Sequence, residues 1–141
     1  MVFNHYKNYV KCNEKQYPVP EYTQDIISFF YFARTIDASK LKEKESFELN
    51  FFLSDSVSTI KVTYEGKENV KTKSGTFRCL KFKPMVLTGN VFKDPYPMTI
   101  WISDDKNKVP VMLQSAVIVG SIKMELVNYE GLANIPTARI K

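Results

Sequence analysis

Apolar and polar residues alternate along most of this chain, in the two-residue period that is typical of β-strands. The clearest example is a pair of alternating runs, Met98–Ser103 and Val109–Ser115, on either side of the polar segment Asp104–Asn107. Side chains two residues apart share one face of a strand, so each run has one apolar face. The pattern predicts a β-hairpin, and this hairpin holds Trp101, the only tryptophan.

Other parts of the chain show the same alternation. The further runs are 2–7, 47–53, 60–64, 68–73, 76–83 and 122–126. Glu65-Gly66 and Ser74-Gly75 have the composition of turns and predict reversals between these strands, while Gly120 marks either a turn or a bulge. Residues 84–97 contain several prolines and predict a long loop, and residues 134–141 predict a frayed tail.

One segment has a different pattern and predicts a helix over Thr23–Thr35. It follows the proline-rich stretch 17–20, and Thr23 is a suitable N-cap. Its apolar residues point in every direction around the helix axis, so the helix has to be enclosed by other elements. Since few residues remain outside the predicted strands, the enclosing element is a curved sheet. The alternative is that the segment is itself a buried strand.

Together these elements predict a mainly β (α+β) fold. We expect a single curved antiparallel sheet of six to eight strands, half-barrel or barrel-like, wrapped on one buried helix at Thr23–Thr35. A chain of 141 residues suits one hydrophobic core. The predicted organisation is one domain over residues 1–133, followed by the tail at 134–141.

The charge of the chain is positive, with a formal net charge of +5. The basic residues are 17 lysines and only three arginines. Sequence-specific contacts to bases and two-pronged contacts to phosphate depend mostly on arginine. The composition therefore disfavours nucleic-acid binding, which stays a minor alternative.

No stretch approaches the roughly 20 apolar residues of a membrane span, and the start lacks a signal peptide, so the residues alone indicate a cytoplasmic protein.

The residues that most often perform chemistry are few and scattered. Cys12 and Cys79 match no metal-ligand spacing, which leaves one disulfide or two buried free thiols as alternatives. His5 is the only histidine and is interpreted as structural. Asp104-Asp105 lacks the spacing of a calcium loop and fits a turn better than a metal site. We predict no enzyme activity, no catalytic residue, no metal and no cofactor.

A hydrophobic ligand is the more specific hypothesis, because aromatic residues are abundant and the helix is apolar all round. Arg34, at the end of this helix, needs a salt bridge or backbone carbonyls as partners, or else binds a ligand carboxylate. The candidate ligand-binding residues are Phe29, Tyr31, Arg34, Phe51, Phe52, Trp101 and Met112.

Four stretches together resemble a known family. They are Tyr22–Thr35, Tyr64–Phe77, Trp101–Asp105 with Val109–Val111, and Val119–Lys123 leading to Tyr129–Leu132. The chain resembles an uncharacterised family of exported Gram-negative bacterial proteins, domain of unknown function 3108. The resemblance implies a periplasmic or outer-membrane-associated protein of which this chain is a C-terminal portion, and it implies no activity. A more distant similarity, at Trp101–Val111, is to periplasmic half-barrel lipoprotein carriers.

The resulting hypothesis is a non-enzymatic cell-envelope protein. In this hypothesis, the curved sheet and the helix leave a concave apolar groove, which binds a lipid or another hydrophobic small molecule. The main alternative is a structural or protein-interaction module of the envelope that has a solid core and an envelope protein as its partner.

Overall fold

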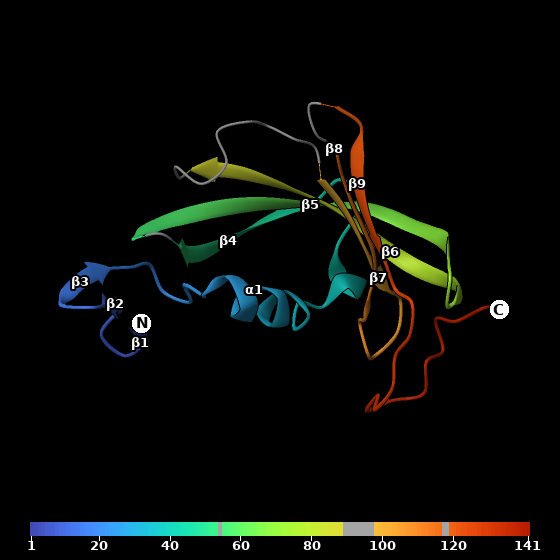
Figure 1. Ribbon diagram of the computed structural model, residues 1–141, viewed down its shortest axis with the longest axis horizontal. Coiled ribbons are helices and arrows are strands. Elements are labelled where there is room, and N and C mark those ends of the chain that lie inside the picture. The colour runs from blue at the N-terminus through green and yellow to red at the C-terminus, as the bar shows by residue number, and fades with distance from the viewer. Residues whose placement is uncertain (54, 89–97, 117–118) are drawn as a thin grey trace. The chain divides into compact units, whose positions relative to one another are not determined.

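Strands dominate the computed structural model, which describes residues 1–53, 55–88, 98–116 and 119–141 (Figure 1). The strands are β1 (Val2–Asn4), β2 (Tyr9–Cys12), β3 (Lys15–Pro18), β4 (Ser46–Leu53), β5 (Ser56–Thr72), β6 (Gly75–Thr88), β7 (Met98–Ser103), β8 (Pro110–Ala116) and β9 (Ser121–Glu125). A single α-helix, α1 (Ile26–Ala33), and a 3₁₀ turn, η1 (Ala38–Lys40), complete the described elements. The predicted mainly β class with one helix is confirmed.

The strands form two sheets. One has the order β1-β2-β3, and the other is antiparallel with the order β4-β5-β6-β7-β8-β9, so that β4 and β9 are its two edges and the sheet is open. The hairpin predicted around Trp101 is confirmed, because β7 pairs with β8 with Trp101 opposite Met112. The register shifts between Trp101 and Ile102, which marks a bulge.

Strands β5 and β6 are longer than the sequence pattern indicates. The predicted reversal at Glu65-Gly66 is wrong, since β5 runs through it for 17 residues. Gly66 has a φ of 93°, so the glycine accommodates a local irregularity within the strand. The reversal predicted at Ser74-Gly75 is confirmed, as β5 ends at Thr72 and β6 begins at Gly75.

The predicted loop at 84–97 is wrong in its first part, because β6 continues to Thr88. The remainder of that prediction, 89–97, lies outside the described residues. Gly120 has a φ of 91° and lies just before β9, so it occupies a bend rather than a strand interior.

The chain divides into two compact units, which we describe separately. The first comprises residues 1–36, 47–61 and 86–95, and the second comprises residues 37–46, 62–85 and 96–141. Nothing in this division tests the predicted domain boundaries, which stay a prediction.

In the first unit, the three-stranded sheet packs against β4 through aromatic rings. Phe52 has almost no exposed surface, and its ring centroid lies 5.4 Å from that of Tyr17 and 6.3 Å from that of Phe3. Val10 of β2 is also fully buried. Adjacent residues of a strand face opposite sides of the sheet. Phe51, the neighbour of Phe52 in β4, therefore packs on the other side, against Phe29.

Helix α1 begins later than predicted, because Asp25 rather than Thr23 is its N-cap. The Asp25 carboxylate accepts hydrogen bonds from the backbone N–H groups of Ile27 and Ser28, at 2.8 and 2.9 Å. Thr23 instead donates its hydroxyl to the Pro20 carbonyl. The residue between them, Gln24, exchanges backbone hydrogen bonds with β4 and is therefore extended, so the helix starts only after it.

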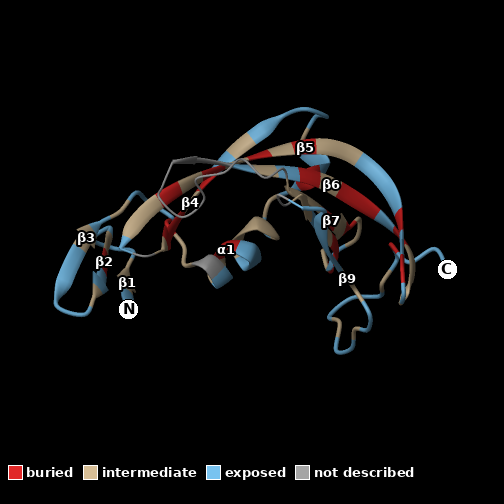
Figure 2. Cartoon of the chain, turned by 45° about the horizontal axis from the view of Figure 1, so that its top comes forward, coloured by how far each residue is buried: buried red, intermediate tan, exposed pale blue. Residues whose placement is uncertain are grey.

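The prediction that α1 is buried on all sides is wrong. Phe29 is buried and packs against Phe51, with ring centroids 6.0 Å apart, whereas three other apolar side chains of the helix are exposed. Figure 2 shows exposed parts of α1 in pale blue. The physical reason is the attachment just described: Gln24 joins the chain to the edge strand β4, so the helix starts beside an edge of the sheet.

The second unit has its own hydrophobic core. It consists of Val70, Phe77, Cys79, Trp101, Val111 and Met112, with Leu126 and Tyr129 packed against them. Tyr129 meets Phe77 edge to face, with ring centroids 6.1 Å apart. Strands β5, β6, β7 and β8 therefore contribute to one cluster.

The predicted frayed tail is instead attached to β6. Backbone hydrogen bonds join Arg78 to Ala138 and Ile140 to Thr76, at 2.8 and 2.7 Å. Ala138 is completely buried. The sequence pattern did not indicate this, because the tail contributes a few backbone bonds rather than an alternating strand.

Candidate functional site

The most unusual surface in the first unit is an apolar stripe on α1. It consists of Ile27, Phe30 and Tyr31, which are 67%, 45% and 64% exposed. Residues three and four positions apart lie on the same face of a helix, so these three side chains are neighbours. We call them the α1 stripe. Exposed apolar side chains that are contiguous indicate a binding surface more often than isolated ones do.

The opposite side of α1 holds the helix in place. Phe29 packs on Phe51, while hydrogen bonds from the Ser28 side chain and backbone to Asp25 hold the pKa of that carboxyl below its ordinary value. A charged Asp25 also interacts favourably with the N-terminal end of the helix dipole. The α1 stripe therefore lies on a helix whose buried side and first turn are both anchored.

A positive charge lies at the C-terminal end of the α1 stripe. Arg34 is the C-cap residue, and its guanidinium lies 5.7 Å from the centroid of the Tyr31 ring, within the range of a cation–π interaction. Nearby, Tyr22 stacks on Phe32 with ring centroids 6.4 Å apart, and Tyr22 is itself exposed. The α1 stripe thus has a cation at its C-terminal end.

The structure groups some of the predicted ligand-binding residues and separates others. Phe29 and Phe51 touch each other in the buried part of the first unit, and Phe52 packs with the three-stranded sheet. These three side chains are core. Tyr31 and Arg34 are at the surface on α1, as described above.

The last two predicted residues, Trp101 and Met112, belong to the second unit. They lie opposite each other in the β7–β8 pairing, and both are buried in the core cluster. Neither unit by itself therefore contains all seven predicted residues. Sequence reasoning also passed over Ile27 and Phe30, although their spacing from Tyr31 was the available signal.

A small hollow in the second unit lies beside Tyr129. Its walls are Phe77, Ser103, Asp105, Val109, Leu126, Tyr129, Leu132 and Pro136. The space fits about one water molecule. It is too small for an acyl chain.

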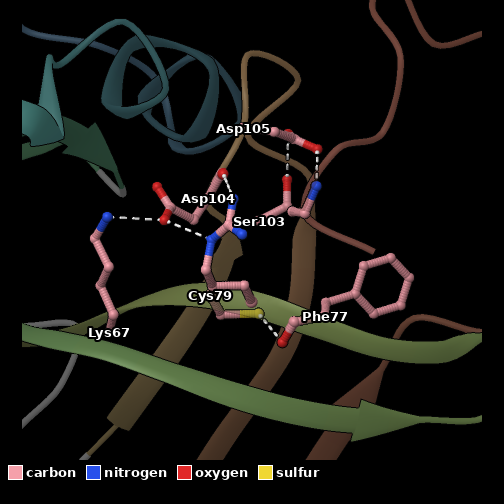
Figure 3. A network of polar contacts seen from close by, with 8 residues as sticks. Lys67, Phe77, Cys79, Ser103, Asp104 and Asp105 are labelled. Atoms are coloured by element: carbon pink, nitrogen blue, oxygen red, sulfur yellow. Dashed lines mark hydrogen bonds and ion pairs between the residues drawn. The ribbon is translucent and has the colours of Figure 1, made fainter. Parts of the chain in front are cut away.

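The adjacent carboxylates of Asp104 and Asp105, which were considered as a metal site, have different hydrogen-bond and ion-pair partners (Figure 3). Asp104 forms ion pairs with Lys67 and Arg78, at 2.9 and 3.0 Å. Burial acts against it, but the hydrogen bonds from these two cations hold the pKa of Asp104 below its ordinary value. Asp105 accepts hydrogen bonds from Ser103 and from the backbone of Ala138, at 2.9 and 3.2 Å.

The turn interpretation of Asp104-Asp105 is confirmed by further bonds. The Asp105 carboxylate also accepts the backbone N–H groups of Asn107 and Lys108, which closes the turn between β7 and β8. Asn107 in turn exchanges two hydrogen bonds of 3.0 Å with the backbone of Asn134. Across the described ranges, no group of three or more His, Cys, Asp or Glu residues has an arrangement that could hold a metal ion.

Trp101 has a polar partner that no sequence signal indicated. Its indole N–H donates to Glu68 over 3.0 Å, and Lys81 forms an ion pair of 2.9 Å with the same carboxylate. The Lys81 ammonium also lies 5.5 Å from the Trp101 ring centroid. The hydrogen bond from Trp101, together with that from Lys81, lowers the pKa of Glu68.

The two cysteines and the single histidine are the remaining residues of chemical interest. Both cysteines are free, and Cys79 is buried as predicted while Cys12 is only half-buried. Burial raises the pKa of Cys79 from 9.0 to about 12, which keeps that thiol protonated and unreactive at neutral pH. His5 is exposed and stacks on Phe3, with ring centroids 5.8 Å apart.

Comparisons with known proteins give one match. A family model described as "Protein of unknown function (DUF3108)" matches residues 2–127. No curated protein and no solved structure matches the chain. Within the described residues, no helix is both long and apolar enough to cross a membrane.

Proposed function

Because this chain belongs to DUF3108, a family of unknown function, we propose a function from its own surface: the protein binds an anionic amphiphile, such as a fatty acid, through the α1 stripe. The observation that supports the proposal is the exposure of Ile27, Phe30 and Tyr31 on one face of an anchored helix. Leaving three large apolar side chains in water is unfavourable, and covering them with an acyl chain removes that cost. The protein acts by binding and performs no catalysis.

The anionic part of the ligand follows from Arg34. Its guanidinium lies at the end of the α1 stripe, over the Tyr31 ring. Guanidinium groups pair strongly with carboxylate and phosphate groups. An amphiphile whose chain lies on Ile27 and Phe30 therefore has its headgroup near a cation.

The test is the binding of a dansylated fatty acid, measured by the rise in probe fluorescence and by displacement with oleate. Ile27→Glu places a charge within the stripe, so we expect its affinity for the probe to fall about tenfold or more. Ile135→Glu is the matched control, since Ile135 is an exposed isoleucine in the other unit, and we expect it to bind as the original protein does.

Arg34→Gln tests the headgroup. This variant should lose the preference for oleate over oleyl alcohol while it retains binding of the alcohol.

Sedimentation with phosphatidylglycerol vesicles distinguishes a monomeric ligand from a lipid surface. Binding to vesicles without binding of the monomeric probe would overturn the proposal in favour of surface attachment. Equal probe affinity in Ile27→Glu and Ile135→Glu would also overturn it.

A module with a solid core is the alternative function, and one observation favours it. The hollow beside Tyr129, in the unit that holds the Trp101 cluster, fits only about one water molecule. This alternative predicts no displaceable probe at any concentration. Recovery of one specific envelope protein on immobilised protein, together with an absence of probe binding, would support it over the amphiphile proposal.

We also propose that the protein is located in the cell envelope of a Gram-negative bacterium. The support is the resemblance of stretches such as Tyr64–Phe77 to exported proteins. Fractionation of native cells, followed by detection of the protein beside periplasmic, outer-membrane and cytoplasmic markers, tests the location. Recovery with the cytoplasmic marker alone would contradict the proposal.

A further inference from the structure

Strand β9 is an edge strand with an exposed surface on both sides. It pairs with β8 on one side, and within the described residues no strand pairs with its other side. Its first four residues, Ser121 to Met124, are all exposed, and two of them are large apolar residues: Ile122 at 54% and Met124 at 63%. Figure 2 shows β9 mostly in the pale blue of exposed residues. Edge strands of this kind readily pair with another strand unless the protein blocks them.

The backbone groups that face outward from β9 can be assigned. Leu126 donates its N–H to Val111 over 2.8 Å, in register with the β8–β9 pairing of Met112 with Glu125. In an antiparallel pair, alternate residues point their N–H and C=O groups toward the partner. Met124 and Ile122 therefore bond to β8, as Leu126 does, while the backbone groups of Lys123 and Glu125 point away from it.

We infer that β9 pairs antiparallel with β9 of a second copy of this chain, around a two-fold axis at Met124. In this register Lys123 lies opposite Glu125 of the second copy, and Glu125 lies opposite its Lys123. Both residues have outward-facing backbone groups, so each of the two pairs forms two ladder hydrogen bonds. Two pairs of opposite charge, directly across from each other, also stabilise the pairing.

The apolar residues of β9 match in the same register. Met124 faces Met124 of the second copy across the axis, and Ile122 lies opposite Leu126, all on one face of the joined sheet. Registers centred on Lys123 or on Glu125 place like charges opposite each other, which is unfavourable. The sequence Ser121–Val127 is thus complementary to itself in the Met124-centred register.

The expected dimer is weak. A strand of five residues buries much less than the roughly 1,600 Å² of a standard protein interface, so monomer and dimer should exchange with concentration. Symmetric contacts of this type use the same patch on both copies and close into a dimer rather than a fibre.

Charge reversal at the two paired positions tests both the contact and its register. Sedimentation equilibrium is measured at low salt, from about 10 μM to 1 mM protein, a range that reports dissociation constants in the micromolar to millimolar range. Lys123→Glu places Glu opposite Glu twice, and Glu125→Lys places Lys opposite Lys twice. We expect each variant alone to associate about tenfold or more weakly than the original chain.

Mixing the two variants is the decisive measurement. In a mixed dimer, both paired positions are acidic in the Lys123→Glu copy and both are basic in the Glu125→Lys copy. Each acidic side chain then faces a basic one, so association should return to the original strength or exceed it. The control is Lys7→Glu, which makes the same change in net charge as Lys123→Glu at an exposed residue of the other unit and should leave association unchanged.

A proline at position 123 tests the backbone pairing. Lys123→Pro removes an N–H that points away from β8, so the sheet of one copy should stay intact while dimerisation is lost. A protein that stays monomeric to 1 mM would overturn the inference, and so would a dimer that Lys123→Glu leaves intact or a variant mixture that does not associate. If the proline variant fails to fold, the charge-reversal series still decides.

Discussion

Trp101 and Glu68 are joined by a hydrogen bond of 3.0 Å from the indole N–H to the carboxylate, between β7 and β5. The buried ring of Trp101 belongs to the core of the second unit, while Glu68 also pairs with Lys81 near the surface. The only tryptophan thus links the hydrophobic core to a surface ion pair. Its fluorescence is a natural reporter for the second unit.

The first prediction concerns the charge of Glu68. The hydrogen bonds from Trp101 and Lys81 lower its folded pKa below 4.5, so the charged form stabilises the fold above pH 4.5 and this contribution is lost as the pH falls through the folded pKa. Glu68→Gln should therefore reduce the free energy of unfolding at pH 7, and this reduction should become smaller as the pH falls below 4.5. Because nearly half of the side chain is exposed, screening keeps the loss below about 1 kcal/mol.

Urea unfolding followed by Trp101 fluorescence measures this difference. Glu130→Gln, at an exposed position, is the control and should change little at either pH. A difference between Glu68→Gln and the original protein that grows toward low pH would contradict the assignment.

The second prediction concerns Asp105, which holds both the β7–β8 turn and the C-terminal segment. Its carboxylate accepts four hydrogen bonds, of which three come from backbone N–H groups. Asp105→Ala leaves these donors unsatisfied, so we expect a loss of about 2 kcal/mol in the free energy of unfolding. Hydrogen exchange should also become faster at Asn107 and Ala138. Lys106→Ala, in the same turn but exposed, should change neither measurement.

The third prediction concerns the two thiols. With a pKa near 12 and no exposed surface, Cys79 should not react with iodoacetamide at pH 8 in the folded, reduced protein, whereas the half-buried Cys12 should react. Mass spectrometry should find one label before unfolding and two after it. Cys12→Ser should show no label until the protein is unfolded. Equal labelling of both thiols in the folded state would disprove the burial of Cys79.

The fourth prediction concerns Ser58 in β5. Its hydroxyl is fully buried and has no hydrogen-bond partner among the described residues. Removing an unsatisfied buried hydroxyl avoids its desolvation cost, so Ser58→Ala should leave the free energy of unfolding unchanged or raise it by about 1 kcal/mol. Thr59→Val is the contrasting variant, because it removes the 2.8 Å hydrogen bond to Asn50 and should destabilise. Destabilisation by Ser58→Ala would indicate a partner for the hydroxyl.

The local sequence pattern predicted the structure correctly where that structure depends on residues close together in the chain. The Trp101 hairpin and the turn at Ser74-Gly75 follow from alternation and turn-forming residues, and the structure has both. The glycine at position 66 shows the limit of such signals. Glycine suits either a turn or an irregular position in a strand. In the folded protein, β5 pairs with β4 and β6 and continues through Gly66.

The candidate site was partly predictable. Tyr31 and Arg34 were expected at a binding surface and lie at the α1 stripe, while Ile27 and Phe30 were treated only as parts of an enclosed helix. Phe29 and Phe51 proved to be core. Hydrophobicity alone does not distinguish a buried face from an exposed one when every position around a helix is apolar.

Periodicity and short turns were enough to establish the antiparallel β class, the single helix and the Trp101 hairpin, because these features depend on residues that are close together in the chain. Contacts formed in the folded protein decided which residue begins α1, which face of that helix is covered, and where the C-terminal segment binds. Each of these depends on hydrogen bonds between residues far apart in the chain, such as Gln24 with β4 and Arg78 with Ala138. A local sequence pattern does not identify such distant partners, because they come together only in the folded protein.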